Sequence, residues 1–259
     1  MKKGRFTFLG TGASTGVPVI GCSCKTCKSK NKKNQRTRPS ALLTLDRKKI
    51  LIDAGPDVRM QLLKQNVQHL DGLILTHSHY DHIAGLDELR AFFFKTQKAL
   101  PCLLSKETYK EIKTRFNYLF LNKKNYSAHF KFQKITKKKE RFLDEEILCL
   151  SYFQGKMEVT GFVLGDLAYL CDIRTYSKSI FQSLQHINTL VISALRKTLS
   201  NVHFSIDEAI EFSKKTSAKN TYFTHIAHEV EHTKINQKLP KGFELAYDGK
   251  TIGFNNAVY

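Results

Sequence analysis

The sequence predicts an α/β fold in which two β-sheets are flanked by helices. Short apolar or alternating runs bounded by turn residues recur along the chain, as strands do. Helical patterns lie between these runs. The early part of the chain forms a meander of strands before any long helix, whereas a doubly wound parallel sheet alternates strand and helix from its start. We therefore expect two sheets.

The predicted strands follow from runs of apolar and β-branched residues that end at turn residues. They cover residues 6–9, 41–45, 50–52, 73–75, 148–152, 161–164, 168–171, 189–192 and 221–223. The predicted helices cover residues 57–66, 83–94, 106–120, 176–184 and 206–216. Ser205 precedes the last helix with Glu208 three residues on, which is the pattern of a capping box. Since no Pro- or Ser-rich linker divides the chain, we expect one domain over residues 1–259.

Composition limits the class of protein. A chain of 259 residues with 41% hydrophobic content can bury one sizeable core. Its longest uncharged apolar runs, such as 41–45 and 72–75, are far shorter than the roughly 20 residues that span a bilayer. An export signal needs an apolar stretch of about 7 to 15 residues, and the run after Lys3 is broken at Thr7 and Gly10. We expect a cytoplasmic protein with no membrane partner, and a homodimer.

The formal net charge of +19 leaves two interpretations open. A basic surface attracts polyanions at long range, so a nucleic acid or a phosphorylated partner is one of them. Much of the excess lies in the runs 28–38 and 134–141, which as solvated loops would have no specific partner.

Six cysteines are present, and three of them crowd into Cys22, Cys24 and Cys27. That spacing is too tight for an ordinary disulfide framework and is typical of metal ligation in a reducing compartment. A tetrahedral structural zinc would need a fourth ligand from elsewhere. The remaining cysteines lie in apolar runs and are predicted to be core residues: Cys102, Cys149 and Cys171.

The densest cluster of chemistry follows the strand at 73–75, where His77, His79, Asp81 and His82 stand within six residues. Residues two apart on an extended segment point the same way, so His77 and His79 can bind one ion. Asp81 and His82, on a turn into the next helix, can serve a second. Imidazole and carboxylate together suit zinc, manganese or iron. Two such ions can hold a bridging hydroxide and stabilise both the attacking and the leaving oxygen.

This cluster, together with Leu51-Ile52-Asp53-Ala54-Gly55, resembles the two defining motifs of the metallo-β-lactamase superfamily. The resemblance implies a four-layered αβ/βα sandwich with two mixed sheets flanked by helices. It implies that Asp53 orients the metal site, as outer-shell partners do. It also implies that Asp172, after the strand at 168–171, bridges both metals and that His225 is the last ligand of the second metal.

One ligand of the family pattern is absent. The family usually places a histidine before a glycine in the loop ahead of the strand at 161–164, and here the matching pair is Gln154-Gly155. An amide oxygen is a weak ligand for a borderline-soft ion. The first metal site is therefore expected to be loose, to select a harder ion such as manganese, or to be degenerate.

A narrower resemblance covers nearly the whole chain. The Cys22-x-Cys24-x-x-Cys27 loop and Thr224-His225-Ile226-Ala227-His228 resemble the branch that contains the cyclic phosphate phosphodiesterase of bacterial phosphonate breakdown. Gly10-Thr11-Gly12 and Ala246-Tyr247-Asp248-Gly249 agree with it. The pyrroloquinoline quinone biosynthesis protein of the same fold also carries such a cysteine loop. By this match a structural zinc ion is held by Cys22, Cys24, Cys27 and His228.

The narrower match adds two histidines. It implies that His203, just ahead of a helix, contacts the substrate phosphate or protonates the leaving alcohol, which a histidine can do near neutral pH. His232 matches a recurring family histidine, but no role follows for it.

The predicted function is a metal-dependent hydrolase that acts on a small, cyclic phosphodiester through a metal-bound hydroxide. Catalysis is assigned to Asp81 and His203. The expected cofactors are one structural zinc ion and one or two zinc or manganese ions at the reaction centre, held by His77, His79, Asp81, His82, Asp172 and His225. Two alternatives stay open: a nuclease of the same fold acting on RNA or DNA, and a non-catalytic metal-binding protein degenerate at Gln154.

Overall fold

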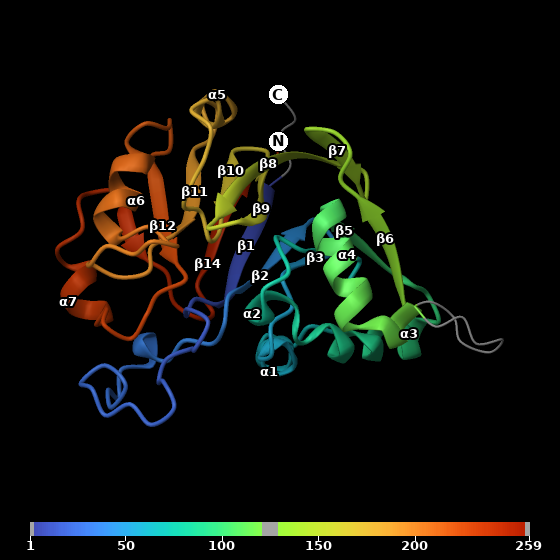
Figure 1. The fold of residues 1–259 in the computed structure, drawn as a ribbon, viewed down its shortest axis with the longest axis horizontal. Coiled ribbons are helices and arrows are strands. Elements are labelled where there is room, and N and C mark those ends of the chain that lie inside the picture. The colour runs from blue at the N-terminus through green and yellow to red at the C-terminus, as the bar shows by residue number, and fades with distance from the viewer. Residues whose placement is uncertain (1–2, 121–128, 257–259) are drawn as a thin grey trace.

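The computed structural model describes residues 3–120 and 129–256. Within them, two seven-stranded sheets lie face to face and helices cover their outer faces (Figure 1). The strand order is β14-β1-β2-β3-β4-β5-β6 in the first sheet and β13-β12-β11-β10-β9-β8-β7 in the second. The predicted sandwich of two mixed sheets flanked by helices is confirmed.

The first sheet begins with the predicted meander, since β1, β2 and β3 pair antiparallel. From β3 to β6 the pairs are parallel, so the ends of β3 and β4 meet at one edge. Its strands are β1 (Lys3–Gly10), β2 (Ser40–Leu45), β3 (Lys48–Ile52), β4 (Gly72–Ile74), β5 (Leu100–Leu104), β6 (Phe130–Lys134) and β14 (Thr251–Asn255).

The second sheet is antiparallel from β7 to β10 and parallel from β10 to β13. Its strands are β7 (Lys139–Phe142), β8 (Glu145–Gln154), β9 (Met157–Leu164), β10 (Leu167–Leu170), β11 (Thr189–Ser193), β12 (Asn220–Thr224) and β13 (Phe243–Leu245). The basic run at 134–141 therefore contributes to an edge strand and is not only a solvated loop.

The helices are shorter than predicted. The helix expected at 83–94 is split into three pieces, because Gly85 packs against the backbone of Gly55, where a Cβ atom would lie 2.2 Å from the Gly55 carbonyl oxygen. The segment 176–184 retains a single helical turn. The helices are α1 (Val58–Lys64), α2 (Tyr80–Ile83), α3 (Arg90–Thr96), α4 (Lys106–Arg115), α5 (Ile180–Ser183), α6 (Ile206–Ser213) and α7 (His232–Asn236), with 3-10 turns η1 (Lys32–Asn34), η2 (Leu86–Leu89) and η3 (Asn117–Phe120).

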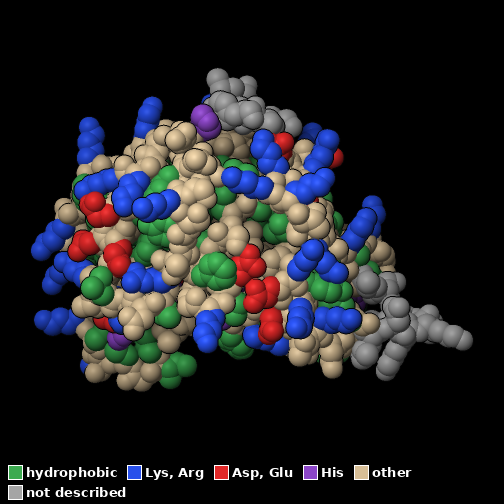
Figure 2. Space-filling view, turned by 45° about the horizontal axis from the view of Figure 1, so that its top comes forward, with side chains coloured by type: hydrophobic (Ala, Val, Ile, Leu, Met, Phe, Trp, Pro, Cys, Tyr) green, Lys and Arg blue, Asp and Glu red, His purple; other side chains and the backbone are tan. Residues whose placement is uncertain are grey.

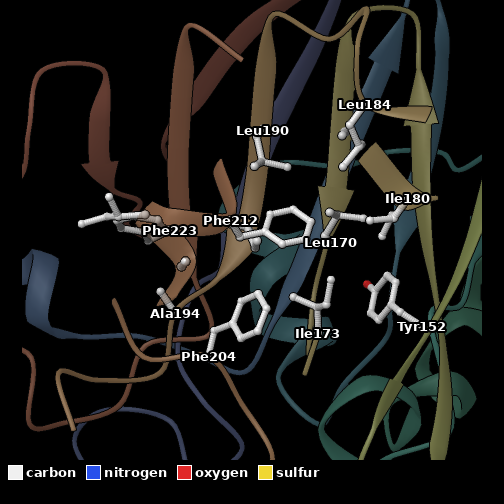
Figure 3. Packing of buried hydrophobic residues seen from close by; sticks show 14 of the residues in the cluster. Tyr152, Leu170, Ile173, Ile180, Leu184, Leu190, Ala194, Phe204, Phe212 and Phe223 are labelled. Atoms are coloured by element: carbon white, nitrogen blue, oxygen red, sulfur yellow. The ribbon is translucent and has the colours of Figure 1, made fainter. Parts of the chain in front are cut away.

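Three apolar clusters fill the layers. One lies between the sheets, one packs α1, α2 and α4 on the first sheet, and one packs α5 and α6 on the second. Figure 3 shows the last of these, where Phe204 and Phe212 face the strands. The capping box at Ser205 and Glu208 is formed, with both of its hydrogen bonds present. The three isolated cysteines are buried, as predicted.

Lysine and arginine side chains are spread over the face of the molecule in Figure 2, with acidic side chains between them in a few places. Two members of the run at 28–38 depart from the expectation of a solvated loop, because Asn34 is 1% exposed and Arg36 is 3% exposed. Among the helices of the described residues, none combines the length and the apolar character needed to cross a bilayer.

Candidate metal centre

The histidine motif lies where β4 leaves the first sheet. The strand ends at Ile74, the backbone continues to His77, and His79 is the N-cap residue of α2. His77 and His82 are completely buried, and Asp81 is nearly so. The two-residue spacing and the helical turn therefore direct these side chains to one place at the sheet edge.

Three further site residues follow other strands of both sheets. Asp53 follows β3, Asp172 stands two residues after β10, and His225 follows β12. All three have left-handed backbone conformations, with φ of 59°, 56° and 57°. Such angles are uncommon for non-glycine residues and persist where the surrounding structure enforces them. The strand ends thus turn sharply at the residues that face the centre.

Four side chains surround the position predicted for the second metal. Asp172 Oδ2 lies 3.1 Å from His82 Nε2, and Asp172 Oδ1 lies 3.1 Å from His225 Nε2. Asp81 Oδ2 lies 3.5 Å from His82 Nε2 and 3.4 Å from His225 Nε2. Donors at about 2.1 Å from one tetrahedral ion stand about 3.4 Å apart. The spacing fits a single ion at the middle of the group.

The position predicted for the first metal adjoins this one. His77 Nε2 lies 3.0 Å from His79 Nδ1 and 3.3 Å from Asp172 Oδ2. Asp172 therefore belongs to both groups, as a bridging carboxylate would. All six side chains that were predicted as ligands are brought together in the structure.

Asp53 and Thr76 orient two of the predicted ligand histidines. Asp53 accepts hydrogen bonds from the backbone N–H and the hydroxyl of Thr76, both at 2.8 Å, and from His82 Nδ1 at 2.7 Å. The Thr76 oxygen lies 2.9 Å from His77 Nδ1. A proton held on Nδ1 of each ring leaves both Nε2 atoms free to bind an ion. Thr76 was not predicted; its place directly before His77 was the only signal.

The electrostatics of the centre call for a cation. Burial disfavours the charged form of the His82 ring, but the carboxylates of Asp81, Asp53 and Asp172 outweigh it and raise the pKa of His82 well above its usual value. Nε2 of His82 and both ring nitrogens of His225 are buried and make no hydrogen bond within the described residues. Buried carboxylates, and buried ring nitrogens that make no hydrogen bond, are costly unless a bound group satisfies them. The residues present fit divalent ions.

His203 lies at the open side of this centre. Its ring stacks on His225 with centroids 4.7 Å apart, and its Nδ1 lies 3.6 Å from Asp172 Oδ1. The side chain is 12% exposed, and His79 is also half-buried. Burial, with the nearby His225, lowers the pKa of His203 to about 4. Gln154 is nearly buried beside it, with its amide nitrogen 2.9 Å from His203 Nε2.

The second cluster joins the cysteine loop to the far end of the chain. His228 Nδ1 lies 3.3, 3.5 and 3.7 Å from the sulfur atoms of Cys22, Cys24 and Cys27. The backbone N–H of Cys27 and the His228 ring lower the pKa of the Cys24 thiol to about 6. Since thiolates and imidazole at these separations suit a tetrahedral ion, the four predicted residues lie where such a site needs them.

His232 and Arg36 form a buried pair behind the cysteine loop. A guanidinium nitrogen of Arg36 donates to His232 Nδ1 at 3.0 Å. Another donates to the Thr11 hydroxyl and to the Ala246 carbonyl oxygen. The His232 backbone N–H donates to Asn34. His232 therefore joins the segment of Asn34 and Arg36 to the start of α7 and lies outside both ligand clusters.

Comparison with known proteins places this fold and site in a family. Residues 48–226 match the model of the β-lactamase superfamily domain. The chain belongs to that superfamily and has the metallo-β-lactamase fold, a fold that implies a divalent metal.

Similar solved structures support the same assignment. A crystal structure of a diphosphatase from the PhnP family is 31% identical, covers 99% of both chains and has a TM-score of 0.93. Zinc-bound PqqB from Methylobacterium extorquens is 17% identical at a TM-score of 0.75, covering 96% of this chain and 99% of that one, and shows the fold alone.

Among curated relatives, an octanoyltransferase of Porphyromonas gingivalis is 31% identical over 255 residues. Those residues are 95% of this chain and 50% of that protein, so the chain spans about half the length of this relative. A ribonuclease Z of Bradyrhizobium diazoefficiens is 36% identical over 85 residues, which are 32% of this chain and 23% of that protein.

Proposed function

We propose that the protein is a metal-dependent phosphodiesterase acting on a small, cyclic phosphodiester. The observation that carries this proposal is the pair of adjoining ligand groups that share Asp172. Paired ions a few ångströms apart are used by many enzymes that displace oxygen from phosphorus. The likeness to a PhnP-family diphosphatase supports phosphoryl chemistry at this centre.

A small substrate suits the depth of the centre. Asp172 and His225 are each 1% exposed, and solvent reaches the group beside the half-buried His79 and His203. When bound, the ions supply an acidified water and positive charge for the phosphoryl oxygens. Asp81 and Asp172 hold their carboxylates between the ligand histidines. His203 can donate a hydrogen bond to a phosphoryl or leaving oxygen that lies beside Asp172.

Two metals are proposed for the centre, as zinc or manganese, and one zinc ion for the cysteine cluster. Gln154 offers an amide oxygen where nitrogen is usual, which favours an ion that accepts oxygen ligands. We also propose that the chain acts as one domain, as a cytoplasmic homodimer. The unpaired thiols of the cysteine loop support a reducing compartment, and light scattering tests the dimer.

The test combines metal analysis with a substrate panel. Purified protein is loaded with zinc or manganese and offered a 2′,3′-cyclic nucleotide, bis(p-nitrophenyl) phosphate and a nucleoside diphosphate. Turnover of the cyclic diester that follows manganese or zinc content supports the proposal. Turnover of the diphosphate alone would replace the proposed substrate class, and an absence of turnover with a fully loaded centre would refute it.

A nuclease of the same fold is the second candidate, and the net charge of +19 favours it. Phosphate contacts release counterions, so nucleic-acid binding of this kind weakens steeply with salt. Labelled RNA or DNA that binds with a strong salt dependence and is cleaved would favour a nuclease. A non-catalytic protein would instead take up the cysteine-site ion but leave the first position empty and turn over nothing.

A further inference from the structure

Gln154 is held at the end of a strand by a tight hairpin. Side chains alternate along β8, so Tyr152 and Gln154 share its buried face. The Tyr152 hydroxyl donates to the Cys171 carbonyl oxygen at 2.7 Å, and Figure 3 shows its ring pointing into the apolar cluster. Gly155 then turns the chain with φ of +59°, and Gln154 pairs with Met157. The strand therefore places the Gln154 amide beside His203.

The two ends of this amide have different surroundings. The amide nitrogen lies 2.9 Å from Nε2 and 3.3 Å from Nδ1 of His203. The amide oxygen is buried and has no hydrogen-bond partner within the described residues. A buried acceptor without a partner is costly, and a cation beside it would satisfy it. The reverse orientation would point two N–H groups toward that cation.

This orientation fixes where His203 carries its proton. An amide nitrogen only donates, and Nε2 is the nearer ring nitrogen, so this contact favours a ring that accepts at Nε2. A neutral imidazole that accepts at Nε2 carries its proton on Nδ1. Nδ1 is the atom that lies 3.6 Å from Asp172 Oδ1. The N–H of His203 therefore faces the centre.

We propose that Gln154 is a positioning residue whose amide nitrogen holds His203 in the Nδ1–H tautomer while its amide oxygen faces the first metal position. The use of that N–H in turnover rests on the proposed function, whereas the tautomer does not. A metal-binding histidine at this position could not donate to His203 from the nitrogen that binds the ion. Glutamine in place of the usual histidine thus links occupancy of the first metal position to the orientation of the His203 N–H.

Nuclear magnetic resonance tests the tautomer directly. Zinc-loaded protein with ¹⁵N-labelled histidine is compared with Gln154→Glu, which keeps an oxygen toward the ion and replaces the donor by an acceptor. The His203 signals are assigned by their loss in His203→Gln. We expect protonated Nδ1 in the wild type and a proton on Nε2 in Gln154→Glu, with no change in Gln68→Glu, an exposed glutamine. Protonated Nε2 in the wild type, or an unaltered pattern in Gln154→Glu, would overturn the proposal.

Kinetics and metal content test the link to turnover. We expect Gln154→Glu to lower kcat by about tenfold or more for a diester with an alkyl leaving group, and less for a 4-nitrophenyl leaving group. In the His203→Gln background the same change should leave kcat unaltered, while zinc and manganese affinity measured by titration still changes. A tautomer shift without loss of kcat would refute the positioning role. A wild type that binds metal and shows Nδ1–H but hydrolyses no phosphodiester would refute only the proposed function.

Discussion

Asp53 Oδ2 lies 2.7 Å from His82 Nδ1 and accepts the Thr76 hydroxyl at 2.8 Å, so one buried carboxylate orients predicted ligands of both predicted metal positions. His82 is held directly, and His77 is held through the Thr76 oxygen. The left-handed turn at Asp53 brings its carboxylate to the end of the neighbouring strand. Ligand geometry therefore depends on a residue that is not itself a predicted ligand.

Replacing Asp53 with asparagine should weaken metal binding by about 10- to 100-fold, as loss of an orienting partner does. The neutral amide introduced by Asp53→Asn has no negative charge and only one acceptor oxygen, so its NH2 group must face a donor, either the Thr76 backbone N–H or the Thr76 hydroxyl and His82 Nδ1. Competition titration with a chromophoric chelator measures the change. Asp46→Asn is the matched control, because Asp46 is also left-handed but lies in an exposed turn. Equal affinities for the wild type and Asp53→Asn would contradict the orienting role.

His203→Gln should lower kcat for the proposed phosphodiesters by about 100-fold or more, because the donor beside Asp172 is removed. The metal content should stay at the wild-type value, since no predicted ligand is altered. Plasma emission analysis and steady-state kinetics make the two measurements. His69→Gln, at an exposed ring beside Asp71, serves as control. Loss of an ion in His203→Gln would instead make this residue a ligand.

Cys24→Ser should release one equivalent of zinc from the cysteine cluster and speed hydrogen exchange over residues 13–35. His225 and His228 share one short segment, which bonds to the backbone of Thr11 and Ala13, so turnover should fall as well. A colorimetric zinc assay and exchange mass spectrometry follow the two effects. Cys102→Ala, in a strand of the first sheet, should retain its zinc. Retention of that equivalent in Cys24→Ser would disprove the predicted ligand set.

We expect His232 to make the free energy of unfolding decrease as the pH is lowered. Burial and the adjacent Arg36 lower its pKa to about 4 from the usual 6.5. The unfolded chain therefore takes up this proton at a higher pH than the folded protein, and stability is lost as pH falls from 6.5 toward 4. His232→Gln should lose about 2 kcal/mol less than the wild type between pH 7 and pH 5. Denaturant unfolding at pH 7 and pH 5 measures the free energy of unfolding of both proteins. Equal losses in the wild type and in His232→Gln would contradict the prediction.

The sequence predicted two sheets flanked by helices and the position of the histidine motif because both depend on local patterns. Apolar runs mark β3, β4 and β10 whatever they pair with, and the six-residue cluster after β4 is dense enough to stand out. Asp172 and His225 carry no such signal alone. They were found through the family resemblance, since a lone residue after a strand is not distinctive.

Other features depend on contacts between distant parts of the chain, which no local pattern encodes. Arg36 and His232 form a buried pair although they are 196 positions apart, and Arg36 stands in a basic run that composition assigns to solvent. Strand β7 is polar because it lies at the edge of its sheet. The apolar alternation that marks other strands is therefore not recognisable in this lysine-rich run. The break after α2 follows from the close approach of Gly85 to Gly55. The proposed role of Gln154 depends on the contact between its amide and the His203 ring, which are 49 positions apart in the sequence.

The ligand residues follow strands of both sheets, so the centre is assembled only after the two halves of the sandwich have docked. Ions that bind the assembled form alone shift the balance away from partly opened chains. We therefore expect a metal-starved cell to hold this protein in a form that proteases degrade sooner. Its abundance, as well as its turnover, would then follow the supply of divalent metal.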